Sequence, residues 1–293
     1  MKTLHEYIQE AEGTAIGHFN ISNMDGFWAV IHAAKEVGVV AHREIPVIIG
    51  VSEGERDFFG TQEISLLVKD YRERTGEPVF LNADHTYSFE KVQEAVDANF
   101  DAVIFDGTEL SFNNNIAMTK KCFEYARNKN PNILVEAELG FIGKSSKLLD
   151  KLPEGVNISE ESLTTPEQAK YFVEETKIDL LAPAVGNIHG MLKGGNDPKL
   201  NISRIKEIRQ AVGIPLVLHG ASGNSAEDIS MAISSGISIV HVSTELRVAY
   251  RIGLMKSLQE NPDEMAPYKY LKGARNAIQR VVEEKLKICN RIS

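Results

Sequence analysis

Eight short apolar runs alternate with helix-like segments along the sequence, and this alternation limits the possible folds more than any other feature. The runs have the length and composition of buried strands, and the segments between them repeat apolar residues at helical spacing. Parallel strands need long connections, which are usually helices. Eight such units in 293 residues predict one α/β domain over residues 1–293, a (β/α)8 TIM barrel. The predicted strands lie at 14–20, 46–52, 78–85, 101–106, 132–139, 179–185, 214–219 and 237–243.

An amphipathic pattern at about 266–288 is left over after the eighth unit and predicts an extra C-terminal helix. This helix could cover the barrel bottom, pack on its side or mediate dimerisation. The alternative fold is an open, doubly wound sheet, which is disfavoured because no glycine-rich dinucleotide turn follows the first strand. The other predicted helices lie at 24–37 (capped by Ser22 or Asn23), 63–74, 89–99, 114–128, 165–176, 202–211, 226–234 and 245–259.

Residues 140–164 interrupt the alternation, because they show no sustained period. A loop of this length inside a compact domain is usually disordered or functional. We expect a mobile lid here, which would close over a bound ligand.

The net charge of −9 argues against a general nucleic-acid-binding protein, which needs a basic face. No apolar stretch reaches the ~18 residues of a membrane span, and residues 1–20 lack the apolar core of a signal peptide. The two cysteines, Cys122 and Cys289, give neither a disulfide framework nor a cysteine zinc motif. We therefore expect a cytoplasmic protein without nucleic-acid or membrane partners.

Polar residues gather at the ends of the predicted strands. Because the carboxyl ends of barrel strands surround one mouth, residues distant in sequence should converge there. Three imidazoles with one open position are a usual arrangement for catalytic zinc, and His85, His189 and His219 could form one. Taken alone, Asp84 and His85 could also be a helix cap beside a loop histidine. The strand-end residues are His18, Asn20, Ser52, Asp84, His85, Asp106, Glu136, Glu138, His189, His219 and His241 to Thr244.

Two glycine-rich turns, 186–195 and 219–223, follow two of these strands. Glycines let backbone N–H groups approach an anion, and a turn that leads into a helix adds the helix dipole. Barrels often bind phosphate with the loops after strands seven and eight, and turn 219–223 with Ser243 and Thr244 fits that position. The alternative is that both are ordinary connecting turns.

These residues occur in stretches that resemble the class II, metal-dependent ketose-bisphosphate aldolases, which include the fructose- and tagatose-bisphosphate aldolases. The resemblance covers essentially the whole chain, in family order. LVLHGAS and STELR look closer to the tagatose-bisphosphate branch. The matching stretches are PVFLNADHTYSFE, VIFDGTELSFNNNI, LVEAELGFIG, LLAPAVGNIHG, IPLVLHGASG and VSTELR.

The resemblance implies a Zn2+-dependent lyase that cleaves a phosphorylated sugar, a ketose 1,6-bisphosphate, into dihydroxyacetone phosphate and glyceraldehyde 3-phosphate. It also implies a homodimer or homotetramer. Asp84 would be the acid/base that serves the C4 hydroxyl. His85, His189 and His219 would hold Zn2+, with Asp106 and Glu138 at a second or alternative metal position and Gly190 and Ser222 near the phosphate and a monovalent cation. The substrate contacts would be Asn20, Ser52, Gly190, Gly220, Ala221, Ser222, His241, Ser243, Thr244 and, from a neighbouring subunit, Lys272.

The implied chemistry agrees with these residue types. Retro-aldol cleavage removes a proton from the C4 hydroxyl and leaves a carbanion beside the C2 carbonyl. A divalent Lewis acid can stabilise that charge without a Schiff-base lysine. Asp84, adjacent to a predicted metal ligand, is well placed for the proton transfer.

The sequence departs from the family pattern at three places. The family has an acidic pair where Lys144, Ser145 and Ser146 stand, an asparagine at the position of His241, and a small residue at that of His18. These departures keep open an aldolase for another phosphorylated keto-sugar, such as the inositol-breakdown type, a non-catalytic metal-binding homologue and, less favoured, a metal-dependent hydrolase. The acids that could replace the missing pair are Asp150, Glu154 and Glu160.

Overall fold

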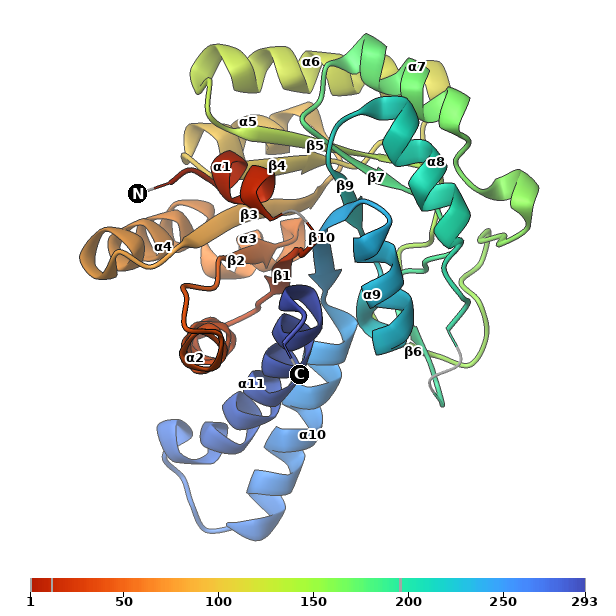
Figure 1. Ribbon diagram of the computed structural model, residues 1–293. Helices are drawn as coiled ribbons and strands as arrows, with labels where there is room; N and C mark the ends of the chain where they lie inside the picture. Colours follow the sequence, from red (N-terminus) through yellow and green to blue (C-terminus); the bar gives the residue numbers. More distant parts are fainter. Residues whose placement is uncertain (1, 12, 195–196, 293) are drawn as a thin grey trace.

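The eight predicted strands form a closed, all-parallel barrel (Figure 1). The computed structural model describes residues 2–11, 13–194 and 197–292. The strands follow one another around the barrel in the order β1-β10-β9-β7-β5-β4-β3-β2, which confirms the predicted (β/α)8 fold. They are β1 (Ile16–Asn20), β2 (Val47–Val51), β3 (Val79–Thr86), β4 (Ala102–Phe105), β5 (Leu134–Leu139), β7 (Leu180–Pro183), β9 (Leu216–Leu218) and β10 (Ile237–Val242).

Helices connect the strands and surround the barrel, and their starts follow from capping residues. Asn23 accepts a hydrogen bond from the backbone of Gly26, and Ser88 accepts one from Lys91. Thr165 forms a capping box, followed by a proline at the first helical position. The main helices that follow the strands are α2 (Met24–Ala41), α4 (Thr61–Thr75), α5 (Phe89–Asp97), α6 (Phe112–Lys129), α7 (Pro166–Thr176), α8 (Ile202–Val212), α9 (Ala226–Ser234) and, after the last strand, α10 (Thr244–Glu260).

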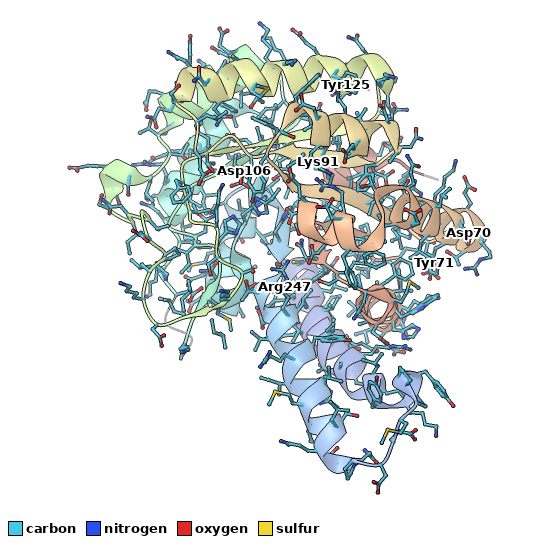
Figure 2. The ribbon with its side chains drawn as sticks, turned by 180° about the vertical axis from the view of Figure 1, so that it is seen from behind. Asp70, Tyr71, Lys91, Asp106, Tyr125 and Arg247 are labelled. Carbon is cyan, nitrogen blue, oxygen red and sulfur yellow. The ribbon has the colours of Figure 1, made fainter. Side chains whose placement is uncertain are left out.

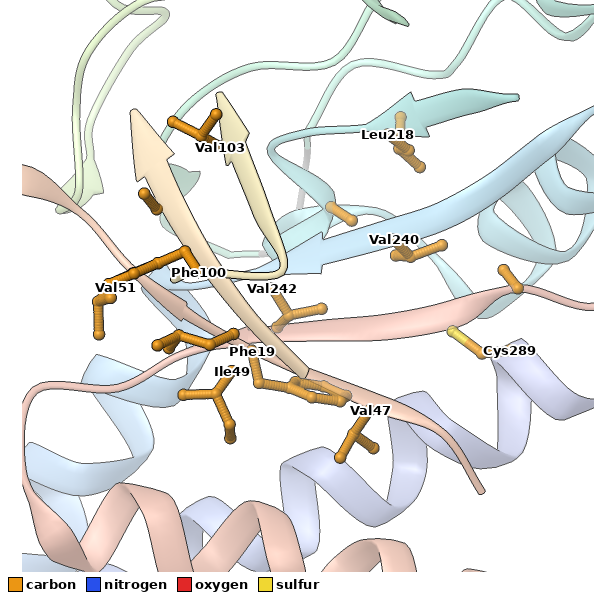
Figure 3. Packing of buried hydrophobic residues seen from close by; sticks show 14 of the residues in the cluster. Phe19, Val47, Ile49, Val51, Phe100, Val103, Leu218, Val240, Val242 and Cys289 are labelled. Atoms are coloured by element: carbon orange, nitrogen blue, oxygen red, sulfur yellow. The ribbon is translucent and has the colours of Figure 1, made fainter. Parts of the chain in front are cut away.

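Two apolar regions stabilise the fold. One lies between the barrel and its helices, where outward-facing residues such as Phe19, Ile49 and Val240 pack (Figure 3). The other fills the lower barrel with inward-facing residues such as Ile16 and Phe80. Helix α1 (Leu4–Glu10) packs Leu4 and Ile8 against this second cluster. The sequence prediction missed α1, because a seven-residue helix with two buried apolar residues carries little periodicity.

The predicted extra helix is α11 (Pro267–Asn290). It packs on the side of the barrel against α2 and α10, and not across the barrel bottom. Helices α10 and α11 extend together beyond the barrel as a hairpin (Figure 1). Lys285 of α11, which is buried, pairs with Glu245 of α10 at 2.9 Å.

The loops at the carboxyl ends contain short elements that the sequence did not reveal. Helix α3 (Glu53–Phe59) follows β2, and single 3-10 turns occupy η1 (Glu160–Ser162) and η2 (Ala221–Gly223). Within segment 140–164, β6 (Leu148–Leu149) pairs in parallel with β8 (Met191–Leu192). Two-residue strands have no detectable period, so this pairing was not predictable. Gly195, the last residue of the glycine-rich turn 186–195, lies outside the described residues.

None of the helices in the described ranges is long and apolar enough to cross a membrane.

Candidate active site

The carboxyl ends of the strands surround a cavity of about 190 Å3. Asp106, at the end of β4, and Arg247, in the first turn of α10, mark this region in the view from behind (Figure 2). Most residues predicted for the site line the cavity, so the strand ends converge as expected. They are Asn20, Ser52, Asp84, His85, His189, Gly190, His219, Gly220, Ser222, His241, Ser243 and Thr244.

Asp84 and His85 are consecutive in β3, yet both reach the cavity. Side chains of a regular strand alternate between its two faces. Here the pairing of β3 with β4 shifts register between Ala83 and Thr86, and His85 has a φ of 37°. An irregularity of this kind re-aims a side chain, and it places a carboxylate and an imidazole side by side at the mouth.

Four side chains bring potential metal-binding atoms together. Nitrogen or oxygen atoms of His85, His189, His219 and Glu138 all lie within 4.8 Å of one another. Glu138 Oε1 is 2.9 Å from His85 Nδ1 and 3.4 Å from His219 Nδ1. Glu138 Oε1, His189 Nε2 and His219 Nδ1 are buried without a hydrogen-bond partner. Orphaned buried polar atoms are costly. A cation among them would satisfy all of them, and this donor set fits Zn2+.

Two further carboxylates hold the imidazoles of this cluster. Asp106 Oδ2 lies 3.1 Å from His85 Nδ1, and Glu136 Oε1 lies 2.8 Å from His219 Nε2. Burial alone would lower the pKa of His85, but its carboxylate neighbours outweigh burial and hold that pKa well above its usual range. Asp106 is not among the four clustered donors, so its place at a second metal position stays a prediction. Glu136 was expected at a strand end, but no role was predicted for it.

Asp84 is buried, and one of its two carboxylate oxygens, Oδ2, is hydrogen-bonded while Oδ1 has no hydrogen-bond partner. Oδ2 accepts a hydrogen bond of 2.8 Å from Asn20, and Oδ1 is 3.5 Å from His241 Nδ1 and 3.9 Å from His85 Nε2. Burial alone would raise the pKa of Asp84, but the charge of His85 and the contact with His241 outweigh burial and keep that pKa well below its usual range. An ionised carboxylate at this position can accept a proton.

The two unexpected imidazoles form a stack beside Asp84. The rings of His18 and His241 are parallel, with centroids 3.5 Å apart, and His241 also stacks on His219 at 4.0 Å. A Cβ at Gly50 would lie 2.1 Å from the His18 ring, so the stack needs a glycine there. Burial lowers the pKa of His18 to about 4, and it lowers that of His241 well below its usual value. Both rings are therefore neutral near pH 7.

The glycine-rich turn after β9 meets the start of α10 at one end of the cavity. Ser222 Oγ accepts hydrogen bonds from the backbone N–H groups of Ser243 and Glu245, at 3.3 and 3.2 Å. Gly220 has a φ of 64°, and a Cβ there would lie 2.1 Å from the carbonyl oxygen of Ile188. The start of a helix attracts anions. Ala221, which was predicted to cradle phosphate, has a fully buried side chain and does not line the cavity.

Arg247 and Tyr87 line the cavity but were not predicted. Arg247 pairs with the buried Glu55 at 2.7 Å. It follows Thr244 by three residues, so the helical spacing of the STELR stretch could have revealed it. Lys272 is exposed on α11 and does not line the cavity of its own chain, and its predicted reach from a neighbouring subunit stays a prediction.

Segment 140–164 lines the cavity with Lys144, Ser145 and Ser146. The three acids proposed as replacements for the missing acidic pair do not line the described cavity. Asp150 pairs instead with Lys193 at 2.8 Å. The three acids are Asp150, Glu154 and Glu160.

Known proteins resemble this chain over nearly its whole length. The family model described as fructose-bisphosphate aldolase class-II matches residues 1–292. A fructose-bisphosphate aldolase of Staphylococcus aureus (strain Mu50 / ATCC 700699) is 37% identical over 278 residues, covering 94% of this chain and 91% of that protein. One from Geobacillus stearothermophilus is 37% identical over 276 residues, covering 93% and 90%. The crystal structure of the YdjI aldolase from Escherichia coli K12 superimposes with a TM-score of 0.79 at 32% identity, covering 97% and 96%.

Proposed function

Since the chain belongs to the class II fructose-bisphosphate aldolases, a family of lyases, we propose that it is a Zn2+-dependent aldolase for fructose or tagatose 1,6-bisphosphate. The products would be dihydroxyacetone phosphate and glyceraldehyde 3-phosphate. One observation carries the proposal: four clustered metal donors adjoin the ionised Asp84 in a cavity that also contains a helix N-terminus.

In this proposal His85, His189, His219 and Glu138 hold the metal, and Asp106 serves a second or alternative position. A bound divalent ion supplies a Lewis acid that polarises the substrate carbonyl. Asp106 contacts the same nitrogen of His85 as Glu138 does. Glu136 contacts the nitrogen of His219 that faces away from the other donors, and so orients that ring. Outer carboxylates of this kind fix the ring tautomer and raise ligand basicity.

Asp84 would take the proton from the C4 hydroxyl. Its Oδ2 is fixed by Asn20, and its low pKa keeps it ionised at neutral pH. A general base must lie within hydrogen-bond reach of the proton that it removes. Asp84 and His85 line the cavity, so a substrate hydroxyl bound there could come within hydrogen-bond reach of Asp84.

The first phosphate would bind at the start of α10. Backbone N–H groups of the turn after β9 and of Thr244 would face it, together with the side chain of Ser243, whose own N–H is bonded to Ser222. Arg247 would add positive charge nearby. Ser222 links the two segments and so fixes their separation. A monovalent cation near Gly190 and Ser222 remains part of the proposal.

Segment 140–164 would be the lid, and copies of the chain would associate into a homodimer or homotetramer. The α10–α11 hairpin supports association, because it extends beyond the barrel and exposes apolar side chains. A second copy could cover them and bring Lys272 near a neighbouring site. The exposed apolar residues include Ile252, Met255, Leu258 and Met265.

One observation favours a second candidate, an aldolase for another phosphorylated keto-sugar. The imidazole of His241 lines the cavity beside Asp84, where the family has an asparagine. A ring at this position narrows the cavity and changes which sugar hydroxyl fits.

The experiment measures triose-phosphate release from fructose and tagatose 1,6-bisphosphates, with Zn2+ and after chelation. We expect metal-dependent cleavage of at least one sugar, and its loss in Asp84→Asn. Zinc-loaded protein that cleaves neither sugar would contradict the proposal, and other phosphorylated ketoses would then test the second candidate.

A further inference from the structure

The cavity contains a cationic side chain that the proposed reaction leaves without a role. Among the residues that the structure describes, two cations other than histidine line the cavity, Arg247 and Lys144. Arg247 is engaged by Glu55, whose side chain is only 8% exposed. Lys144 belongs to segment 140–164, and its side chain is 37% exposed. The Arg247 side chain is nearly as exposed, at 33%, but its partner is buried, whereas the partner of Lys144 is exposed. Lys144 is therefore the lining cation whose present partner an incoming ligand can displace more easily.

Lys144 lies across the barrel mouth from the start of α10. Its Nζ is 4.5 Å from the ring centroid of Tyr87, and that ring stacks on His85 at 6.3 Å. His85 belongs to β3, whereas Ser243 follows β10, and β1 and β2 separate these strands around the barrel. A ligand anchored at Ser243 that passes the metal donors thus extends toward Lys144.

The present partner of Lys144 is easily replaced. Lys144 Nζ lies 2.6 Å from Glu109 Oε2, and the Glu109 side chain is 62% exposed. An ion pair in this setting contributes little, because water screens it. A phosphate group offers more charge and three acceptor oxygens. The ammonium also makes a cation–π contact with the face of Tyr87, which lines the same cavity.

We propose that Lys144 binds the second phosphate of the substrate, so that one chain recognises both ends of a ketose bisphosphate. This inference rests on the proposed function, because it takes the first phosphate to bind at α10. Lys144 then determines specificity, favouring ketose bisphosphates over ketose 1-phosphates. It performs within one chain a task that the family resemblance assigned to Lys272 of a neighbouring subunit.

The test compares fructose 1,6-bisphosphate with fructose 1-phosphate, using the zinc-loaded full-length protein. Lys144→Met should lower kcat/KM for the bisphosphate roughly ten- to hundredfold, mainly through KM, because a charge-assisted hydrogen bond is lost. It should leave kcat/KM for fructose 1-phosphate unchanged. Glu109→Gln should lower KM for the bisphosphate, because it removes the competing carboxylate.

The matched control is Lys147→Met, because Lys147 is exposed on the same segment and does not line the cavity. This variant should leave kcat/KM unchanged for both sugars. An unchanged preference for the bisphosphate in Lys144→Met overturns the inference. The inference is also overturned if Lys272→Met abolishes the preference for the bisphosphate and Lys144→Met leaves it intact. Lys144 is exposed, so its variant should fold as the wild type does, and circular dichroism checks this.

Calorimetry measures the affinity of the same two sugars for the wild type, for Asp84→Asn and for Asp84→Asn with Lys144→Met. These affinities separate this inference from the proposed function. If the wild type turns over no sugar but binds the bisphosphate more tightly through Lys144, the proposed function fails and the inference stands. Equal binding of the two sugars overturns the inference, whatever the turnover.

Discussion

Replacing Glu136 with glutamine tests how one buried carboxylate supports metal binding. Glu136 Oε1 lies 2.8 Å from His219 Nε2, and both side chains are buried. The other ring nitrogen, Nδ1, is 3.4 Å from Glu138 Oε1 and has no hydrogen-bond partner. His219 therefore presents Nδ1 to the other metal donors and donates its Nε2–H to Glu136.

The expected effect is a weaker zinc site in a protein that still folds. Loss of an outer partner of this kind typically costs ~10–100-fold in metal affinity, or about 1.4–2.7 kcal/mol. Glutamine has nearly the same size, and its amide oxygen can still accept from Nε2–H. Burial raises the pKa of Glu136 despite the contact with His219, so the neutral amide also removes a buried charge. We expect the metal-free unfolding free energy to change by less than about 1 kcal/mol.

Competition with a chromophoric chelator measures the zinc Kd, and urea unfolding of the metal-free protein measures stability. Asp150→Asn is the control, because Asp150 is an exposed carboxylate that pairs with Lys193 outside the cavity. A wild-type Kd in Glu136→Gln would refute the assigned role. An equal loss of metal-free stability would show that Glu136 supports the fold and not the metal.

Three further predictions concern stability, each measured by urea unfolding of the metal-free protein. Because the pKa of His18 falls from 6.5 to about 4 on folding, the free energy of unfolding should decrease by about 3 kcal/mol as the pH falls from 6.5 to 4. His18→Ala should reduce this pH dependence, and an unchanged pH dependence would contradict the prediction. Gly50→Ala places a Cβ 2.1 Å from the His18 ring and should lower the free energy of unfolding by roughly 1–3 kcal/mol. Adding His18→Ala to the same chain should largely restore the lost stability. Lys285→Met leaves the partly buried Glu245 unpaired and should cost about 2–4 kcal/mol, whereas Lys285→Met with Glu245→Gln should cost less.

The barrel and the position of its mouth follow from the sequence, because strand length and helical period are local properties. Asp84 and His219 are far apart in sequence, yet closure of the sheet brings both to one cavity. The sequence could therefore predict which residues converge. It could not predict the pairing of Glu136 with His219, because that contact depends on the relative heights of β5 and β9.

Other features were hidden because their signals are short or nonlocal. The two-residue pairing of β6 with β8 has no period. Arg247 appears as a cavity residue only when the start of α10 is placed beside the turn after β9. In the sequence, Lys144 was identified only as the residue at a position where the family has an acid. Its contact with Tyr87 depends on the path of a loop without periodicity. Such paths are set by packing and not by local propensity.

Along a single strand, successive inward-facing residues belong first to the apolar core, then to the side chains that support the site, and last to the site itself. Along β1, Ile16 belongs to the lower apolar cluster, His18 to the imidazole stack and Asn20 to the cavity wall. Strand β5 repeats this order with Leu134, Glu136 and Glu138. Since side chains alternate with a period of two, a register slip by one residue would move all three levels to the wrong face. The apolar level therefore fixes the register that the polar levels require. Substitutions at the middle level should then alter metal affinity or the pKa of Asp84 without contacting the substrate.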